Sequence, residues 1–125
     1  MTERWYPITD FYDFDRHQRC RHRKDPPVKW IQLSCVYKLR IGKKIIHVGR
    51  SDTCRRHGGA EKVRKAIIQL LGITDKNPSV AKTKMWEQLR LQYQPSYFNI
   101  ELGIIETRNV AKVYAQELKA TNQLL

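Results

Sequence analysis

The first clear pattern in the chain is a pair of short segments rich in β-forming residues. Residues 30–39 contain tryptophan, tyrosine and branched aliphatic side chains in partial alternation with polar ones, and residues 44–49 have a similar composition. The residues between them, 40–43, include Gly42, which suits a short turn. The pattern therefore predicts an antiparallel hairpin made of these two strands.

Two helical patterns follow the hairpin. After Gly58-Gly59 apolar residues recur with a period of 3.6 residues until Gly72, so a helix is expected between these glycines. A second helix is expected to start at Asn77-Pro78-Ser79 and to end before Pro95. The apolar positions are Ala60, Val63, Ala66, Ile67, Leu70 and Leu71 in the first helix, and Val80, Met85, Trp86, Leu89 and Tyr93 in the second.

The C-terminal part of the chain predicts one more strand and one more helix. Residues 97–105 are rich in aromatic and branched side chains, which favour a third strand. From about Arg108 the apolar residues fall at helical spacing again. The predicted order is thus β-β-α-α-β-α. This order indicates an α+β fold, with a small three-stranded antiparallel sheet flanked by helices.

Residues 1–28 carry no regular period. Aromatic side chains come first, a charged run at residues 16–24 follows, and the segment closes at Pro26-Pro27. We expect a basic and aromatic arm of irregular structure, packed on a domain that spans residues 29–125. A zinc site made of His17, Cys20 and His22 is an alternative, but a fourth ligand at a suitable spacing is not evident.

Length and composition indicate one globular domain. The chain has 125 residues, of which 41% are hydrophobic and 10% aromatic, enough to build a core. No apolar run approaches the length of a membrane helix, and the N-terminal residues do not resemble a secretory signal. Three widely spaced cysteines do not make a disulfide framework. We therefore expect a cytoplasmic protein.

The charge points to a polyanionic partner. Lysine and arginine total 24 against 12 acidic residues, which gives a net charge of +12. Residues 38–65 alone carry ten of these cations against Asp52 and Glu61. A concentration of positive charge of this kind is typical of proteins that bind nucleic acid. An ordinary solvated basic surface is the alternative.

Candidate reactive side chains occur in three places. Tyr37 lies near the end of the first predicted strand, and His47-Val48-Gly49 ends the second. A polar and basic loop follows, which contains Arg55 and Arg56. In the last predicted helix, Glu117 lies on or beside the apolar face, where a carboxylate is costly unless it is paired or holds a metal ion.

Together these features resemble the GIY-YIG nuclease family. Cys35-Val36-Tyr37 would correspond to the first motif of the family and His47-Val48-Gly49 to the second, followed by Arg56 and the late helical Glu117. The resemblance covers about residues 30–122, and the predicted element order agrees with the family's core. The chain departs from the pattern at several positions. Cys35 replaces the first glycine, and His47 replaces the second tyrosine. His57 stands where the family's helix arginine usually falls, so Arg56 corresponds to it only if the loop is one residue shorter.

The resemblance implies a metal-dependent endonuclease that hydrolyses phosphodiester bonds in DNA. Tyr37 would accept a proton from water, His47 would position that water, and Arg56 would contact the phosphate, with Arg55 as the second candidate. Glu117 would hold one Mg²⁺ or Mn²⁺ ion. Glu106 is the alternative metal ligand. The residues expected to contact the nucleic acid backbone are Lys38, Lys43, Lys44, Arg50, Arg55, His57 and Lys62.

Two other functions stay open on the sequence alone. A binding module of the same fold that lacks turnover is favoured by the histidine at position 47. A small RNA-binding protein is favoured by size and charge, so RNA remains an alternative partner to DNA. A double-strand cut would need two active sites, and a dimer is one way to supply them.

Overall fold

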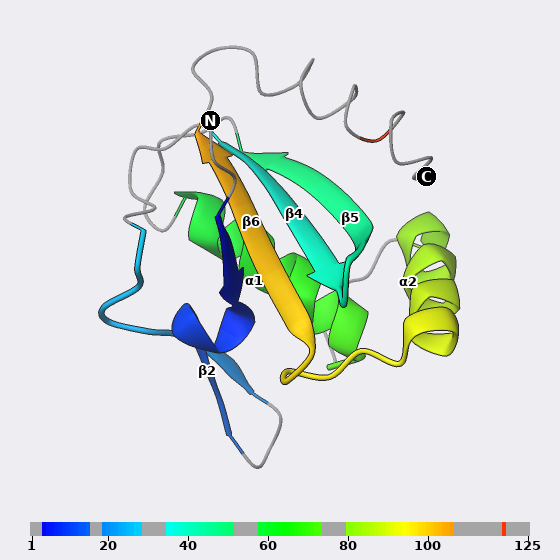
Figure 1. Cartoon of the computed structure of the whole chain (residues 1–125). Coiled ribbons are helices and arrows are strands. Elements are labelled where there is room, and N and C mark those ends of the chain that lie inside the picture. Colours follow the sequence, from blue (N-terminus) through cyan, green and yellow to red (C-terminus); the bar gives the residue numbers. More distant parts are fainter. Residues whose placement is uncertain are drawn as a thin grey trace.

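The computed structural model describes residues 4–15, 19–28, 35–51, 58–73 and 80–106, together with residue 119. Within these residues the fold is α+β, with antiparallel sheets and two α-helices. A four-stranded sheet has the order β1-β6-β4-β5, and α1 lies across one of its faces (Figure 1). The strands are β1 (Trp5–Pro7), β4 (Cys35–Ile41), β5 (Lys44–Ser51) and β6 (Ile100–Glu106), and the helices are α1 (Gly58–Leu71) and α2 (Val80–Tyr93).

The predicted hairpin is confirmed as β4 and β5. Ile41 pairs with Lys44, so the turn consists of Gly42 and Lys43 alone. Gly42 has a φ of +61°, and glycine at the first central position is the requirement of a type II′ turn. The register shifts between Leu39 and Arg40, which leaves an extra residue on β5. The part of the first predicted strand before β4 lies outside the described residues.

The first helix agrees with the prediction. Its periodic apolar residues face the sheet, and Val63, Ile67 and Leu70 are fully buried. Gly72 ends the helix with a φ of +75°, while the Ile73 amide donates to the Ile68 carbonyl at 3.0 Å. Together with the bond from the Gly72 amide to the Gln69 carbonyl, this is a Schellman motif, in which glycine avoids the strain of the left-handed conformation.

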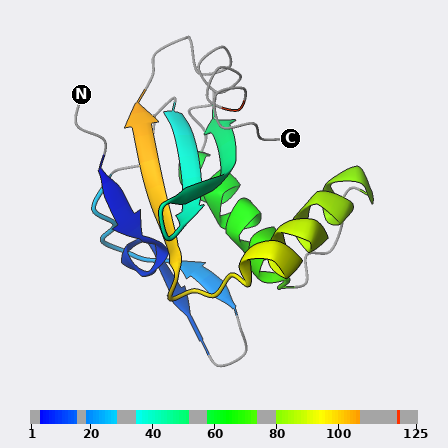
Figure 2. The same cartoon turned by 45° about the vertical axis from the view of Figure 1, so that its right-hand side comes forward.

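The second helix packs beside the first, where Figure 2 shows its C-terminal part close to the end of α1. Trp86 is its most buried residue, at 4% exposure, and Met85, Leu89 and Tyr93 pack more loosely against the core. The Arg90 guanidinium donates to the Gln69 carbonyl at the end of α1. The predicted start of this helix lies outside the described residues.

Two predictions about which elements are present were wrong within the described residues. The sheet has a fourth strand, because β1 pairs with β6 through Trp5 and Gly103. The N-terminal segment is not irregular: after β1 come a 3₁₀ helix, η1 (Ile8–Asp10), and a small hairpin of β2 (Tyr12–Phe14) and β3 (Cys20–His22). Ile8, Phe11, Tyr12 and Cys20 are all buried in the common core. The segment is therefore part of the folded core.

The third predicted strand begins later than expected. Residues 97–99 form a turn, and β6 starts only at Ile100. The predicted last helix, from about residue 108, lies outside the described residues except for Lys119, which is helical. Neither described helix is long and apolar enough to cross a membrane.

Candidate active site

Tyr37 and Gly49 form a matched pair at the centre of the candidate site. Tyr37 in β4 lies opposite Gly49 in β5 and Ile104 in β6, on the face of the sheet that α1 covers. A Cβ atom at position 49 would lie 2.6 Å from Cε1 of Tyr37 and closer still to Cζ and Oη. The tyrosine ring thus fills the space that any other residue at position 49 would need. Tyr37 and Gly49 both lie inside their strands rather than at the strand ends.

His47 lies beside this pair on the same face of the sheet. It pairs with Leu39, and the centroid of its ring lies 5.7 Å from that of Tyr37. On its other side the ring of Trp86 in α2 lies 4.8 Å away. His47 is half-buried, whereas Trp86 is 4% exposed. Because two rings contact the imidazole, its orientation is restricted, as a group that positions water requires.

The first turn of α1 is tied to the N-terminal hairpin through Tyr12. The Tyr12 hydroxyl donates to the Ala60 carbonyl at 2.7 Å. Burial raises the pKa of Tyr12 well above its ordinary value, and the nearby groups of Cys20, Glu61 and Tyr37 raise it further. The hydroxyl therefore stays protonated and remains a donor. This bond holds the start of α1 against the sheet face that carries Tyr37.

A polar cluster completes the attachment of α1 to β3. The Glu61 carboxylate lies 2.7 Å from Nε2 of His22 and accepts a hydrogen bond from Arg64 at 3.1 Å. Arg64 Nε also donates to the Cys20 carbonyl at 2.7 Å. Residues 52–57, with Arg55 and Arg56, directly precede this helix in the chain. The cluster therefore fixes the first turns of α1 against β3.

The zinc alternative for the N-terminal segment loses support. Cys20 is 2% exposed, and burial raises the pKa of its thiol to about 12. A zinc ligand must be a thiolate, which this surrounding disfavours. His22 makes its short contact with Glu61, and His17 lies outside the described residues. Among the residues that the structure describes, no group of three or more histidine, cysteine or acidic side chains is placed to hold a metal ion.

Lys38 is buried on the opposite face of the sheet. It is 3% exposed, and its ammonium lies 5.1 Å from the centre of the Trp5 ring. The Arg40 guanidinium lies 4.1 Å from the same ring and pairs with Glu101 at 3.1 Å. Burial lowers the pKa of Lys38, and the charge of Arg40 lowers it further. A phosphate cannot reach this side chain, which corrects its expected place among the nucleic-acid contacts.

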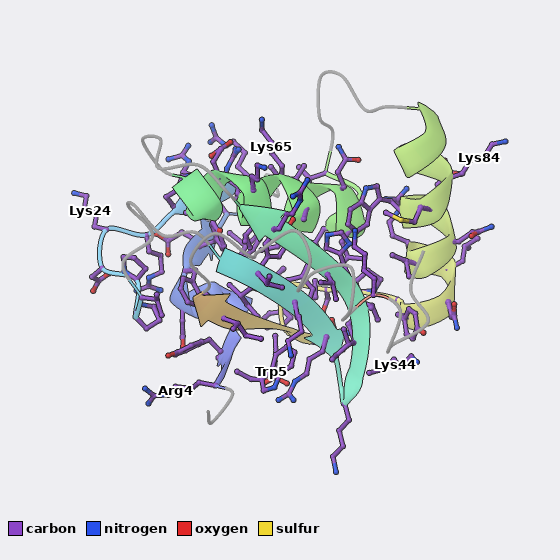
Figure 3. The ribbon with its side chains drawn as sticks, turned by 90° about the horizontal axis from the view of Figure 1, so that it is seen from above. Arg4, Trp5, Lys24, Lys44, Lys65 and Lys84 are labelled. Atoms are coloured by element: carbon purple, nitrogen blue, oxygen red, sulfur yellow. The ribbon has the colours of Figure 1, made fainter. Side chains whose placement is uncertain are left out.

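The other cations of this segment that the structure describes lie on different parts of the fold. Lys43, Lys44 and Lys62 are exposed, as expected of phosphate contacts, whereas Arg50 is half-buried opposite Val36. Figure 3 shows Lys44, near the hairpin turn, and Lys65, on α1, pointing away from the molecule in different directions. Among the described cations of residues 38–65, the positive charge is therefore not confined to one side of the fold.

Four of the predicted site residues, Arg55, Arg56, His57 and Glu117, lie outside the described residues. Of the catalytic set, the structure brings together Tyr37 and His47. Glu106, the alternative metal ligand, ends β6 and pairs with Cys35, two residues before Tyr37. Sequence reasoning missed Trp86 as a neighbour of His47 because its helical spacing indicated only a core residue. The role of Glu61 was missed because its partner, His22, is 39 residues away.

Comparisons of the chain with known protein families, curated proteins and solved structures found no match.

Proposed function

We propose that the protein is a metal-dependent endonuclease that hydrolyses phosphodiester bonds in DNA. The observation that carries the proposal is the contact of Tyr37 with Gly49 and His47. These residues belong to two separate segments of the sequence, and they meet on one face of the sheet. The net charge of +12 supports a polyanionic substrate.

The roles of the side chains follow from what hydrolysis requires. A water molecule must lose a proton as it attacks phosphorus, and the charge on the phosphate must be neutralised. In the proposal Tyr37 accepts the proton in its phenolate form and becomes a neutral phenol, and His47, held between Tyr37 and Trp86, positions the water. Arg56 would bind the non-bridging phosphate oxygens through its planar pair of donors.

In the proposal, Glu117 is the residue that holds the metal ion. A bound Mg²⁺ or Mn²⁺ would supply positive charge to the scissile phosphate. Glu117 lies outside the described residues, and the described residues offer no metal-binding group of three ligands.

A plasmid-nicking assay with Tyr37→Phe tests the proposal. The substitution removes one oxygen and leaves the ring over Gly49, so the fold should be kept. Loss of the proton acceptor should lower the rate about 100-fold or more. Tyr93→Phe, on α2, is the matched control and should cut as fast as the wild type. Cleavage should stop in the presence of a chelator. Equal rates for Tyr37→Phe and the wild type would contradict the role of Tyr37.

A binding module without turnover is the second candidate. The low exposure of Tyr37, 6%, favours it, because a proton acceptor has to reach water. If the wild type binds DNA tightly but does not cut it with Mg²⁺ or Mn²⁺, the binding module is the better description.

A further inference from the structure

Two large aromatic side chains are exposed next to each other at the start of β6. Phe98 is 80% exposed and Tyr97 is 41% exposed. Leu91 on α2 is the other large hydrophobic residue that is exposed in the described part of the chain. An exposed aromatic group costs free energy in water, and adjacent ones commonly mark a binding surface.

The turn that carries these rings is held by its own hydrogen bonds. The Asn99 side chain accepts from the Ser96 amide at 2.8 Å and donates to the Gln94 carbonyl at 3.3 Å. The Asn99 amide donates to the Ser96 carbonyl, and the Phe98 amide donates to the Ser96 hydroxyl. Because these hydrogen bonds hold the backbone of the turn, its main chain needs no further ordering when the rings bind a ligand.

A third ring extends the surface to the N-terminal hairpin. Phe14 in β2 is stacked on Tyr97, with centroids 5.4 Å apart and planes 16° apart. The Tyr97 and Phe98 centroids are 4.0 Å apart. The three residues Phe14, Tyr97 and Phe98, here called the aromatic platform, thus form one continuous cluster whose outer member is the most exposed.

The described acidic residues next to the platform are paired with arginines. From residue 88 to residue 100 the chain contains Arg90 and no acidic residue. The two acids that flank Phe14 are paired with arginines: Asp15 with Arg19 at 3.0 Å, and Asp13 with Arg23 at 3.6 Å. In a chain with a net charge of +12, the two described acids beside Phe14 are thus each paired with an arginine and oppose a polyanion less than free carboxylates would.

We propose that the aromatic platform stacks on an unpaired base of single-stranded DNA. This inference rests on the proposed function and narrows its substrate to DNA with unpaired bases near the cut. Bases offer flat apolar faces of any sequence, which aromatic side chains bind by stacking, while nearby cations follow the backbone. Ile100 and Ile104 pair with Ile41 and Tyr37, so the end of β6 next to the platform lies about 13 Å from Tyr37 along the sheet.

The test compares a labelled oligothymidine with a blunt DNA duplex, both measured by fluorescence anisotropy at one salt concentration. Phe98→Ala should weaken binding of the single strand about tenfold or more and should leave duplex binding unchanged. Phe98→Trp should restore single-strand binding. Leu91→Ala is the matched control, because it removes an equally exposed apolar side chain from α2 and should change neither affinity.

Each other outcome has a distinct meaning. If the wild type binds the single strand and Phe98→Ala binds it equally well, the platform is not a base-stacking surface, while the proposed nuclease function is unaffected. If the wild type binds neither polymer, both proposals fail. Sedimentation of the same samples identifies a further contradiction: if Phe98→Ala only converts a dimer into a monomer, the platform binds a second copy of the chain.

Discussion

The phenol ring of Tyr37 occupies the space in which a Cβ atom of residue 49 would lie. We predict that Gly49→Ala displaces this ring, because Tyr37 is 6% exposed and has little room to move. Overpacking of this kind costs about 1–3 kcal/mol in the free energy of unfolding. Cleavage should fall together with stability, since the hydroxyl moves with the ring. Urea unfolding and plasmid nicking measure the two effects.

A double-mutant cycle tests the cause of that loss. In a Tyr37→Ala background the space beside position 49 is empty, so adding Gly49→Ala should cost little or nothing further. If the second substitution is as costly as it is in the wild type, the loss arises from the strand backbone and not from the tyrosine ring.

The hairpin and the first helix could be predicted because each contains several repeats of its period. In α1 five buried apolar positions fall on one face and Gly72 ends the helix, so pattern and structure agree. The strands β1, β2 and β3 have three residues each, which is too short for a period to appear. The start of β6 was misplaced because Tyr97 and Phe98 favour strands, whereas the side chain of Asn99 closes a turn there.

The site was predictable only in part. The tyrosine and the glycine could be found as motifs, but the contact between them depends on the register of β4 and β5. Lys38 was predicted to contact nucleic acid because the alternation of apolar and polar residues places it on the polar side of its strand. Trp5, from a strand that the pattern did not reveal, covers that side and buries the lysine.

We predict that exposed and buried lysines differ in their effect on salt dependence. If about six phosphates are neutralised, the logarithm of the DNA binding constant should fall with the logarithm of salt concentration with a slope near −5. Lys43→Gln or Lys44→Gln should make that slope shallower by about 0.9 for each phosphate that the variant no longer neutralises. Lys38→Met should leave the slope unchanged, because Lys38 is buried. A flat salt response of the wild type would contradict the phosphate contacts altogether.

Cys20 should make the fold sensitive to alkali. Its pKa in the folded protein is about 12, above the value of 9.0 of an unperturbed thiol. The stability that the buried neutral thiol contributes is complete below about pH 9 and is lost as the pH rises toward 12. Tyr12 contributes with the same sign, since its pKa is raised as well.

The measurement is urea unfolding of the wild type and of Cys20→Ala at about pH 8 and about pH 10.5. The wild type should lose about 2 kcal/mol more than the variant between these pH values, at about 1.4 kcal/mol per pH unit. Equal losses in the two proteins would show that the thiol is not the group responsible.

We predict that substitutions of Glu117 and Arg56 affect DNA binding and DNA cleavage to different extents. Glu117→Ala should abolish metal-dependent cleavage and leave DNA binding intact or slightly tighter, because it removes the metal anchor and also a repulsion toward phosphate. Arg56→Ala should lose about 100-fold or more in rate together with part of the binding, because the proposed role of Arg56 is to contact the phosphate both before and during the reaction. Glu87→Ala, an exposed glutamate on α2, is the control for the charge change. Circular dichroism establishes that each variant is folded. A folded Glu117→Ala protein that cuts as fast as the wild type would remove Glu117 from the site and leave Glu106 as the carboxylate to test.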